Sequence, residues 1–466
     1  MIDPRFRSHN IHQQDVKLFS ELDPNLSELK RHPLVYHFPL LNRLPKDQPG
    51  IYTITGGRQI GKTTVLKQWM ADLLASGVDP NTITYLTGEL VDDHHSLVRL
   101  VSQITAEHKV QCPFYCLLDE ITYVKDWEKG IKFLADAGIL RNTVLILTGS
   151  DSMIIREARM RLPGRRGRSA VVDFHLFPLS FFEFVKLTLN IDQNEIEEAP
   201  HRTVNSDLAE RLDAAFGSYL LHGGYLTAIN DVESDGRIHL STFNTYTDWI
   251  RGDVLKHGKQ ERFLMEICDG IIKRYGTQIS WNSLAKDLSI DHPATVADYI
   301  ELLSGMDVLF VQPALQEDRL SGAPKKARKV LFNDPFIFHS LRSWLQPTGD
   351  PFQELVRAFL ADPASTGRLV EACAVSHYAR FYPTYYIKAE GEVDIAYISK
   401  GRFWPLEIKW TGQIRSKDLK QVSKYKNSRI ATRTGAQKRI HGIPTEPLVS
   451  LLFRLGPSPY TLPHRV

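Results

Sequence analysis

The residues best suited to chemistry in this sequence lie in a short glycine-rich stretch, residues 56–63, which reads Gly-Gly-Arg-Gln-Ile-Gly-Lys-Thr. Glycines allow backbone amides to converge on phosphate oxygens, because no side chain blocks the approach. Lys62 would neutralise β- and γ-phosphates, and Thr63 would offer its hydroxyl to Mg²⁺. The spacing predicts a nucleoside triphosphate site, with a chance match in a long chain as the alternative. The predicted binding residues are Gly56, Gly57, Arg58, Gln59, Ile60, Gly61, Lys62, Thr63 and Thr64.

A pair of acidic residues, Asp119 and Glu120, comes directly after the apolar run 114–118. A buried strand that ends in two acids is typical of the Mg²⁺-binding end of an ATPase sheet. We expect Asp119 to hold the metal ion with Thr63, and Glu120 to polarise the attacking water as a catalytic residue beside Lys62. The alternative is a strand that ends in an ordinary polar turn.

Hydroxyl and guanidinium groups follow the next two predicted strands. Thr148 and Ser150 come after the run 143–147, where either hydroxyl would sense a γ-phosphate or cap the next helix. The stretch 161–168 holds several arginines, which could stabilise a transferring phosphoryl group, contact a nucleic-acid backbone or form a solvated turn.

A second group of charged residues lies near the C-terminus. Glu371 falls on a predicted helix, Asp394 on a predicted strand, and Glu407 and Lys409 on the next strand, where alternation places them on one face. A hairpin would bring Asp394 beside Glu407, so that three carboxylates and a lysine converge. Asp394 and Glu407 would then bind Mg²⁺ or Mn²⁺, and Lys409 would orient a water molecule. Acids with a lysine near a strand are also common by chance.

These groups need elements that position them. Runs of β-branched and aromatic residues predict buried strands, and the helix that follows the glycine-rich stretch should begin at about Gly61, with its amides facing the phosphates. Residues 181–265 read as mainly helical. The predicted strands of this first part are 51–55, 82–87, 114–118, 143–147 and 170–176.

Residues 279–315 predict two helices, 283–288 and 294–303, followed by an apolar strand. This is the pattern of a winged helix-turn-helix, whose second helix can enter a DNA groove. Asp298 and Glu301 on that helix oppose phosphate approach, so protein contact is equally consistent with it. The basic run 325–329 is better suited to phosphate contacts, and a solvated basic turn is its alternative.

Length and composition set wide limits. The 466 residues suggest about three domains, and a net charge of +3 is too small to indicate a nucleic-acid partner by itself. No apolar run reaches the roughly 18 residues of a membrane helix, so we expect a cytoplasmic protein with no membrane partner. The four cysteines are too scattered for a disulfide framework or zinc site, namely Cys112, Cys116, Cys268 and Cys373.

Together, the motifs resemble those of prokaryotic AAA-type ATP-binding proteins that carry a C-terminal domain of unknown function. The resemblance also includes Phe177 to Phe184 and Gly223-Gly224-Tyr225, and the chain departs from it with Gly57 in place of proline and with Asp151. It implies an ATPase core followed by a helical lid, a winged helix and a restriction-endonuclease-like domain. The acids and lysine near the C-terminus resemble the PD-(D/E)-x-K nucleases, with Glu371, Asp394, Glu407 and Lys409 as catalytic residues and Gln421, on a following helix, as a helper.

We therefore predict an α/β protein with a P-loop NTPase core of the AAA/ASCE type, a parallel sheet, and the three further parts just named. The expected cofactors are ATP and Mg²⁺, and the expected partner is DNA, with a homo-oligomer left open. One hypothesis is an ATP-driven enzyme that binds and cuts DNA, and the other is a nucleotide switch that assembles with proteins and never cuts. The predicted boundaries are 1–45 for a lead-in, 46–180 for the core, 181–265 for the lid, 266–330 for the winged helix and 331–466 for the nuclease-like domain.

Overall fold

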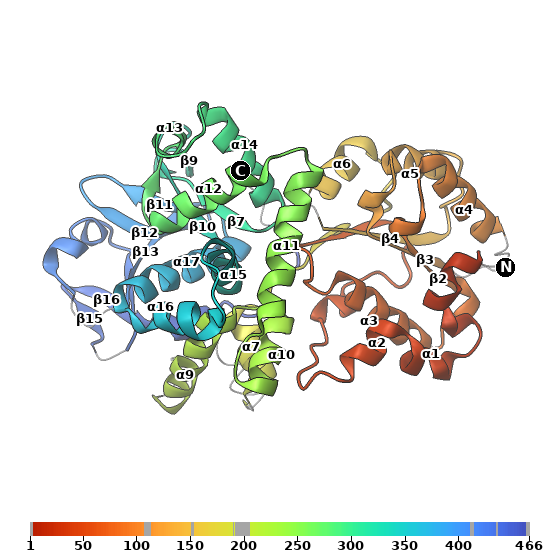
Figure 1. The fold of residues 1–466 in the computed structure, drawn as a ribbon, viewed down its shortest axis with the longest axis horizontal. Coiled ribbons are helices and arrows are strands. Elements are labelled where there is room, and N and C mark those ends of the chain that lie inside the picture. The colour runs from red at the N-terminus through yellow and green to blue at the C-terminus, as the bar shows by residue number, and fades with distance from the viewer. Residues whose placement is uncertain are drawn as a thin grey trace. The chain divides into compact units, whose positions relative to one another are not determined.

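The protein divides into two compact units, residues 1–177 and 178–466 (Figure 1). The computed structural model describes residues 3–106, 113–150, 153–189, 191, 206–410, 414–434 and 437–462. Cys112 and Asp151 lie outside these ranges. All three predicted parts that follow the ATPase core lie within the second unit, and no described helix is long and apolar enough to cross a bilayer.

The first unit is built on a five-stranded sheet in the order β2-β3-β4-β1-β5, in which every pair is parallel. β4 lies between β1 and β3, so the glycine-rich loop after β1 and the acids after β3 emerge at the same edge. The predicted parallel sheet is confirmed. Its strands are β1 (Gly50–Thr55), β2 (Ile83–Thr87), β3 (Phe114–Asp119), β4 (Thr143–Gly149) and β5 (Asp173–His175).

The fifth strand is shorter than the prediction of 170–176. Gly167 has φ of 88°, a left-handed conformation that bends the chain. Upstream of β5, isolated backbone hydrogen bonds reach β1, from Ile51 N to Arg166 O and from Thr53 N to Val172 O. The helices around the sheet are α1 (Val16–Leu22), α2 (Pro24–Leu29), α3 (Lys62–Ala75), α4 (His94–Ala106), α5 (Trp127–Asp136) and α6 (Met153–Arg161).

The N-terminal residues cover the edge strand β2. The Asn10 side chain accepts a hydrogen bond from Tyr85 N at 2.7 Å and donates one to Tyr85 O at 2.8 Å, while Gln13 donates to Ile83 O. An edge strand presents unpaired backbone groups that favour aggregation. The side-chain amides of Asn10 and Gln13 form hydrogen bonds with such groups of β2.

The second unit begins with a helical part, as the apolar periodicity predicted. The Gly223-Gly224 pair makes the tight turn in it, because a Cβ on Gly224 would lie 2.1 Å from Leu179 O and the Gly224 amide donates to Asp334 Oδ2 at 2.9 Å. The helices are α7 (Phe181–Thr188), α9 (Ser206–His222), α10 (Leu226–Asp235), α11 (Leu240–Lys256) and α12 (Glu261–Lys273).

A three-stranded antiparallel sheet, in the order β6-β10-β7, follows the helical part. The two helices predicted at 283–288 and 294–303 lie between its first and second strands in the chain. The elements are β6 (Gln278–Ile279), α13 (Trp281–Lys286), α14 (Pro293–Gly305), β7 (Leu309–Gln312) and β10 (Arg328–Phe332), with the short pair β8 (Leu315–Gln316) and β9 (Ser321–Gly322) between β7 and β10.

The last part is a six-stranded sheet in the order β11-β12-β13-β14-β16-β15. β11, β12 and β13 form an antiparallel meander, and β14 and β16 add in parallel. The strands are β11 (Thr384–Lys388), β12 (Glu392–Ser399), β13 (Arg402–Lys409), β14 (Arg429–Thr432), β15 (Arg439–Ile440) and β16 (Ile443–Pro447), and the helices are α15 (Pro335–Leu345), α16 (Ala358–Ala361), α17 (Pro363–Phe381) and α18 (Leu448–Arg454), with a π-helical segment η7 (Phe352–Arg357).

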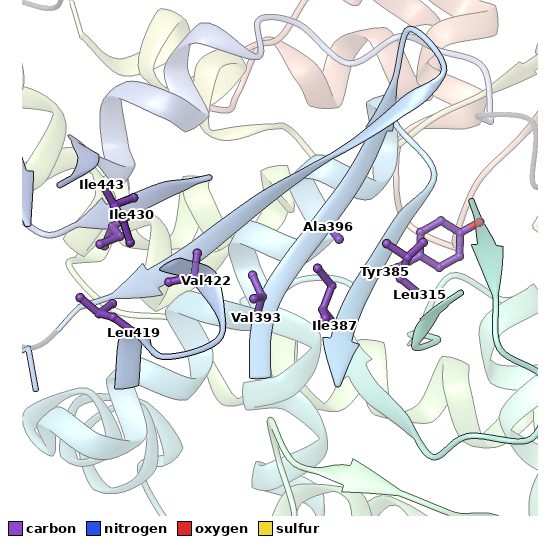
Figure 2. Packing of buried hydrophobic residues seen from close by; sticks show 9 residues of the cluster. All are labelled: Leu315, Tyr385, Ile387, Val393, Ala396, Leu419, Val422, Ile430 and Ile443. Atoms are coloured by element: carbon purple, nitrogen blue, oxygen red, sulfur yellow. The ribbon is translucent and has the colours of Figure 1, made fainter. Parts of the chain in front are cut away.

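Figure 2 shows the apolar cluster that joins the strands of this sheet. Two short 3₁₀ turns after β13, η8 (Ser416–Leu419) and η9 (Val422–Lys424), contribute Leu419 and Val422 to it. Burial of such side chains stabilises the sheet by about 1.5–3 kcal/mol each. The cluster consists of Leu315, Tyr385, Ile387, Val393, Ala396, Leu419, Val422, Ile430 and Ile443.

His377 of α17 is buried and tied to two elements of the second unit. Its Nδ1 lies 2.7 Å from Cys373 O and so carries the proton, while Nε2 accepts a hydrogen bond from Phe181 N at 2.9 Å. A proton on Nε2 would face that amide. Burial, followed by the charge of Arg380, lowers the pKa of His377 to about 3.

We expect His377 to make the second unit less stable in acid. The unfolded chain takes up a proton at a pKa of about 6.5 and the folded chain does not, so this contribution is complete above that pH and falls by about 1.4 kcal/mol per unit as pH decreases toward 3. Between pH 7 and pH 5, the free energy of unfolding should fall by about 2 kcal/mol less in His377→Gln than in His292→Gln, a control at an exposed site. Urea denaturation at several pH values measures this difference. Equal slopes in the two variants would contradict the prediction.

Candidate functional site

The glycine-rich loop forms a backbone cradle between β1 and α3. Gly56 and Gly61 have φ of 142° and 99°, and a Cβ on Gly56 would lie 2.5 Å from Leu176 O. Gly61 is the N-cap of α3, so the helix begins at Lys62, as predicted. The first amides of a helix have no partner within the helix, and together with the helix dipole they suit an anion such as a phosphate.

Lys62 is buried at the base of this loop. Its ammonium donates to Gly56 O at 3.0 Å and Gly57 O at 2.9 Å, and lies 3.6 Å from Glu120 Oε1. The predicted catalytic pair, Lys62 and Glu120, is therefore brought together across two strand ends. Glu120 has φ of 48°, which turns the chain sharply after β3.

Asp119 collects hydrogen bonds from three hydroxyl groups. Thr63 Oγ1 donates to Oδ2 at 2.6 Å, Tyr85 OH donates to the same oxygen at 2.7 Å, and Thr148 donates to Oδ1. The predicted metal ligands Thr63 and Asp119 thus lie in contact. Tyr85 was missed by the sequence reasoning, because nothing in its strand marks it as a partner of Asp119.

Thr148 and Ser150 both face the acids after β3. The Thr148 hydroxyl also accepts from Glu120 N at 2.8 Å, and Ser150 Oγ lies 3.4 Å from Glu120 Oε2. Thr148 therefore positions both acids through one hydroxyl. Whether Thr148 senses a γ-phosphate or caps a helix stays a prediction, since its hydroxyl is already bonded to both acids.

Three of the four arginines of 161–168 pair with acids of the first unit, and the fourth, Arg168, is exposed. Arg166 is buried, pairs with Asp173 at 2.6 Å and donates to Val172 O. Arg161 lies 3.2 Å from Glu128, and Arg165 pairs with Asp136. Arg166 accordingly ties the loop to the sheet, which explains its position without a phosphate.

Comparison with protein families agrees with this geometry, since the family described as AAA domain matches residues 48–185. Residues 48–185 are an AAA domain. A second family, described as a domain of unknown function (DUF8612), matches residues 213–348. Proteins with an AAA domain generally bind ATP with Mg²⁺ and hydrolyse it. Neither match extends beyond residue 348, so neither family gives evidence about the acidic residues near the C-terminus.

A relative from Haemophilus influenzae, described as an uncharacterized protein, is 28% identical over 193 residues. These residues are 40% of this chain, and the chain spans 41% of the length of that curated relative.

Among solved structures, the chain is similar to a RuvB variant from Thermotoga maritima, with 16% identity, 58% of this chain and 84% of that chain covered, and a TM-score of 0.27. It is also similar to Cdc6p from Pyrobaculum aerophilum, with 11% identity, 77% and 96% covered, and a TM-score of 0.23. A third likeness is to C. elegans PCH-2, with 13% identity, 47% and 66% covered, and a TM-score of 0.27. TM-scores this low support no statement about function.

Downstream of the AAA domain, the structure gathers the predicted acids around β12 and β13. The hairpin pairs Ile395 with Leu406, which places Asp394 beside Glu407, and Asp394 Oδ2 accepts a hydrogen bond from Ile408 N at 2.8 Å. Lys409 Nζ lies 2.6 Å from Glu407 Oε1. Glu407 Oε2 is buried and has no hydrogen-bond partner among the described residues.

The acidic oxygens that lie closest together come from Glu371, Glu392 and Asp394, all within 4.8 Å of one another. We call these three residues the acid cluster. Glu392 was not among the predicted residues, and Glu407, which was, is not part of this cluster. Burial, then Asp394, raises the pKa of Glu371 to about 7, and the same causes raise that of Glu407 above its ordinary value.

A lysine already occupies the acid cluster. Lys329 Nζ lies 2.6 Å from Glu371 Oε1, pairs with Glu392 Oε1, and lies 3.8 Å from Asp394 Oδ1. As it stands, the cluster does not fit a metal ion, because an ammonium takes the place between its oxygens.

The residues of the basic run 325–329 therefore differ in burial. Lys329 is 1% exposed and faces inward, so it does not belong to a phosphate-contacting patch as the sequence suggested. Lys325 and Lys326 are exposed, and the Arg328 guanidinium lies 4.6 Å from the centroid of the Trp281 ring.

Gln421 does not lie on a long helix. It precedes the 3₁₀ turn η9, and its Nε2 donates to Tyr425 OH at 2.9 Å. Its backbone approaches closely to Gly391, where a Cβ would lie 2.9 Å from Gln421 Cβ. This contact explains its burial, so that the helper role expected for Gln421 is left without support.

Proposed function

We propose that this protein is a Mg²⁺-dependent ATPase whose nucleotide state controls a DNA-binding C-terminal unit. One observation carries the ATPase part. Lys62 and Thr63, at the start of α3, meet Asp119 and Glu120, at the end of β3, at one edge of the parallel sheet. In α/β proteins, phosphates bind at the carboxyl ends of the parallel strands.

Each residue of this group has a distinct task. The backbone amides of the loop and the Lys62 ammonium bind and neutralise the β- and γ-phosphates. Thr63 and Asp119 have the oxygen ligands that Mg²⁺ prefers, and the ion when bound spreads the charge of the phosphates. Glu120 orients the attacking water and accepts its proton.

The DNA-binding part rests on the segment 278–332 of the second unit. Two helices lie between the first and second strands of a small antiparallel sheet, an arrangement found in winged helix-turn-helix proteins. Lys325 and Lys326 are exposed at the turn before β10, where they can approach a phosphate backbone, and Lys326 Nζ donates to Lys388 O at 3.4 Å. The acidic Asp298 and Glu301 of α14 are also exposed, so we assign phosphate contact to the turn.

We expect the double variant Lys325→Ala/Lys326→Ala to bind DNA about tenfold or more weakly at 0.1 M salt. Each lost phosphate contact lowers the dependence of log affinity on log salt by about one. Fluorescence anisotropy with a labelled duplex, measured at several salt concentrations, gives both quantities. Lys273→Ala, on α12, is the matched control, and a double variant that binds like this control would contradict the assignment.

A second function is favoured by the lysine in the acid cluster. A nuclease-like domain whose acids are neutralised internally suits a nucleotide switch that assembles with proteins. In that case ATP would still be hydrolysed, Lys62→Ala would abolish hydrolysis, and no linear, supercoiled or branched DNA would be cut with Mg²⁺. Cleavage by the wild type that Lys409→Ala abolishes, with ATP hydrolysis retained, would exclude this second function.

A further inference from the structure

Lys329 lies at the centre of a row of three side chains that connects two sheets of the second unit. In the three-stranded sheet, Lys329 of β10 pairs with Gln278 of β6 and with Gln312 of β7. All three side chains contact the acidic region: Gln278 Nε2 donates to Glu392 Oε2 at 2.5 Å, and Gln312 Nε2 donates to Asp394 O at 2.8 Å. Lys329 thus lies between two glutamines, each of which is bonded to the acidic region.

The Lys329 ammonium contacts carboxylate oxygens in the way that a bound metal ion would. An ammonium has three donors, and the three nearest carboxylates come from the acid cluster. Divalent metal ions in proteins bind to just such groups of carboxylate oxygens. A divalent ion bound between these oxygens would have to displace the ammonium, because both cations would use the same carboxylate oxygens.

The ammonium keeps its charge in this setting. Burial by itself lowers the pKa of Lys329, but Glu371, Asp394 and Glu392 together raise it above its ordinary value. Removing its charge would leave buried carboxylates without a partner, which is costly.

We propose that Lys329 is the resident cation of the acid cluster, and that it excludes divalent metal ions from Glu371, Glu392 and Asp394 while the three-stranded sheet is docked. The lysine belongs to the segment 278–332, to which DNA binding is assigned above. In the acid cluster, Glu392 and Asp394 belong to β12 of the C-terminal sheet and Glu371 belongs to α17. The contact is thus an internal block on a nuclease-like site. A displacement of β10 would withdraw the ammonium and expose a site for Mg²⁺ or Mn²⁺.

The test is Mn²⁺ binding to the full-length protein without nucleotide, followed by electron paramagnetic resonance. Lys329→Met keeps the length of the side chain and removes its charge, so this variant should gain one Mn²⁺ site that the wild type lacks. The site should disappear again in Lys329→Met/Glu392→Gln. Lys329→Arg keeps a cation and should gain no site, and Lys273→Met, on α12, is the exposed control.

Two results would overturn the inference. The first is a wild-type Mn²⁺ site that Glu392→Gln removes, since the lysine would then share the cluster with a metal ion. The second is a Lys329→Met protein with a wild-type circular dichroism spectrum and no new site. If Lys329→Met does not fold, the wild type and Glu392→Gln still decide the question, because the inference requires equal Mn²⁺ binding in both.

This experiment is independent of the proposed function. Loss of ATP hydrolysis or of DNA binding in the variants described above would not alter the Mn²⁺ result. A negative Mn²⁺ result would likewise leave the ATPase assignment intact.

Discussion

Glu120→Gln is expected to lower the rate of ATP hydrolysis by about 10²- to 10⁴-fold, the usual contribution of a general base. The amide keeps the size of the side chain and its position after β3, but it cannot accept a proton from water. ATP binding should persist, because the phosphates are held by the loop and Lys62. Phosphate release and binding of a fluorescent ATP analogue measure the two effects separately.

The matched control for this variant is Glu28→Gln, at an exposed position of α2 that pairs with Arg31. It should hydrolyse ATP at the wild-type rate. A Glu120→Gln protein that also hydrolyses ATP normally would show that Glu120 is not the base, and its contact with Ser150 would then be structural. Loss of ATP binding in this variant would instead assign the carboxylate to nucleotide affinity.

Lys67→Met is expected to lower the free energy of unfolding of the first unit by about 3–5 kcal/mol, as for a buried ion pair that loses one partner. Lys67 is fully buried, lies 2.8 Å from Asp23 Oδ2, and donates to His9 O at 3.0 Å. Burial lowers the pKa of Lys67, while Asp23 raises it. Its ammonium also lies 3.8 Å from the centroid of the Tyr85 ring.

Hydrogen exchange of amides in α3 measures this loss locally, and the exposed Lys17→Met is the control. The double variant Lys67→Met/Asp23→Leu should lose less stability than the sum of the two single variants, because no uncompensated charge stays buried. Additive losses would mean that the pair contributes through packing and not through charge.

The same pair connects the N-terminal segment to the ATP site. Lys67 contacts Tyr85, and Tyr85 donates to Asp119, so the segment that covers β2 also supports a predicted Mg²⁺ ligand. Burial, then Asp119, raises the pKa of Tyr85, which keeps its hydroxyl a donor at neutral pH. The polar, proline-rich start of the chain gave no sign of this connection.

The sequence alone determined the first site in most of its detail. Gly56, Gly61, Lys62 and Thr63 are neighbours along the chain, so the strand, loop and helix that hold them are local structure. The acids after β3 were also predictable, because an apolar run that ends in charge gives both the strand and its end. The order of the strands, with β4 between β1 and β3, could be predicted only by assuming that the strands pack in parallel.

Tertiary structure alone decided which distant groups share a space. Tyr85 is 34 residues from Asp119, and Lys329 is 42 residues from Glu371, and strand alternation predicts the face of a residue but not its neighbour in another sheet. Lys329 stands in a basic run that reads as solvated, yet register with Gln278 and Gln312 turns it inward. A buried charge must find opposite charge, and only the packing of the two sheets shows that the acid cluster supplies it.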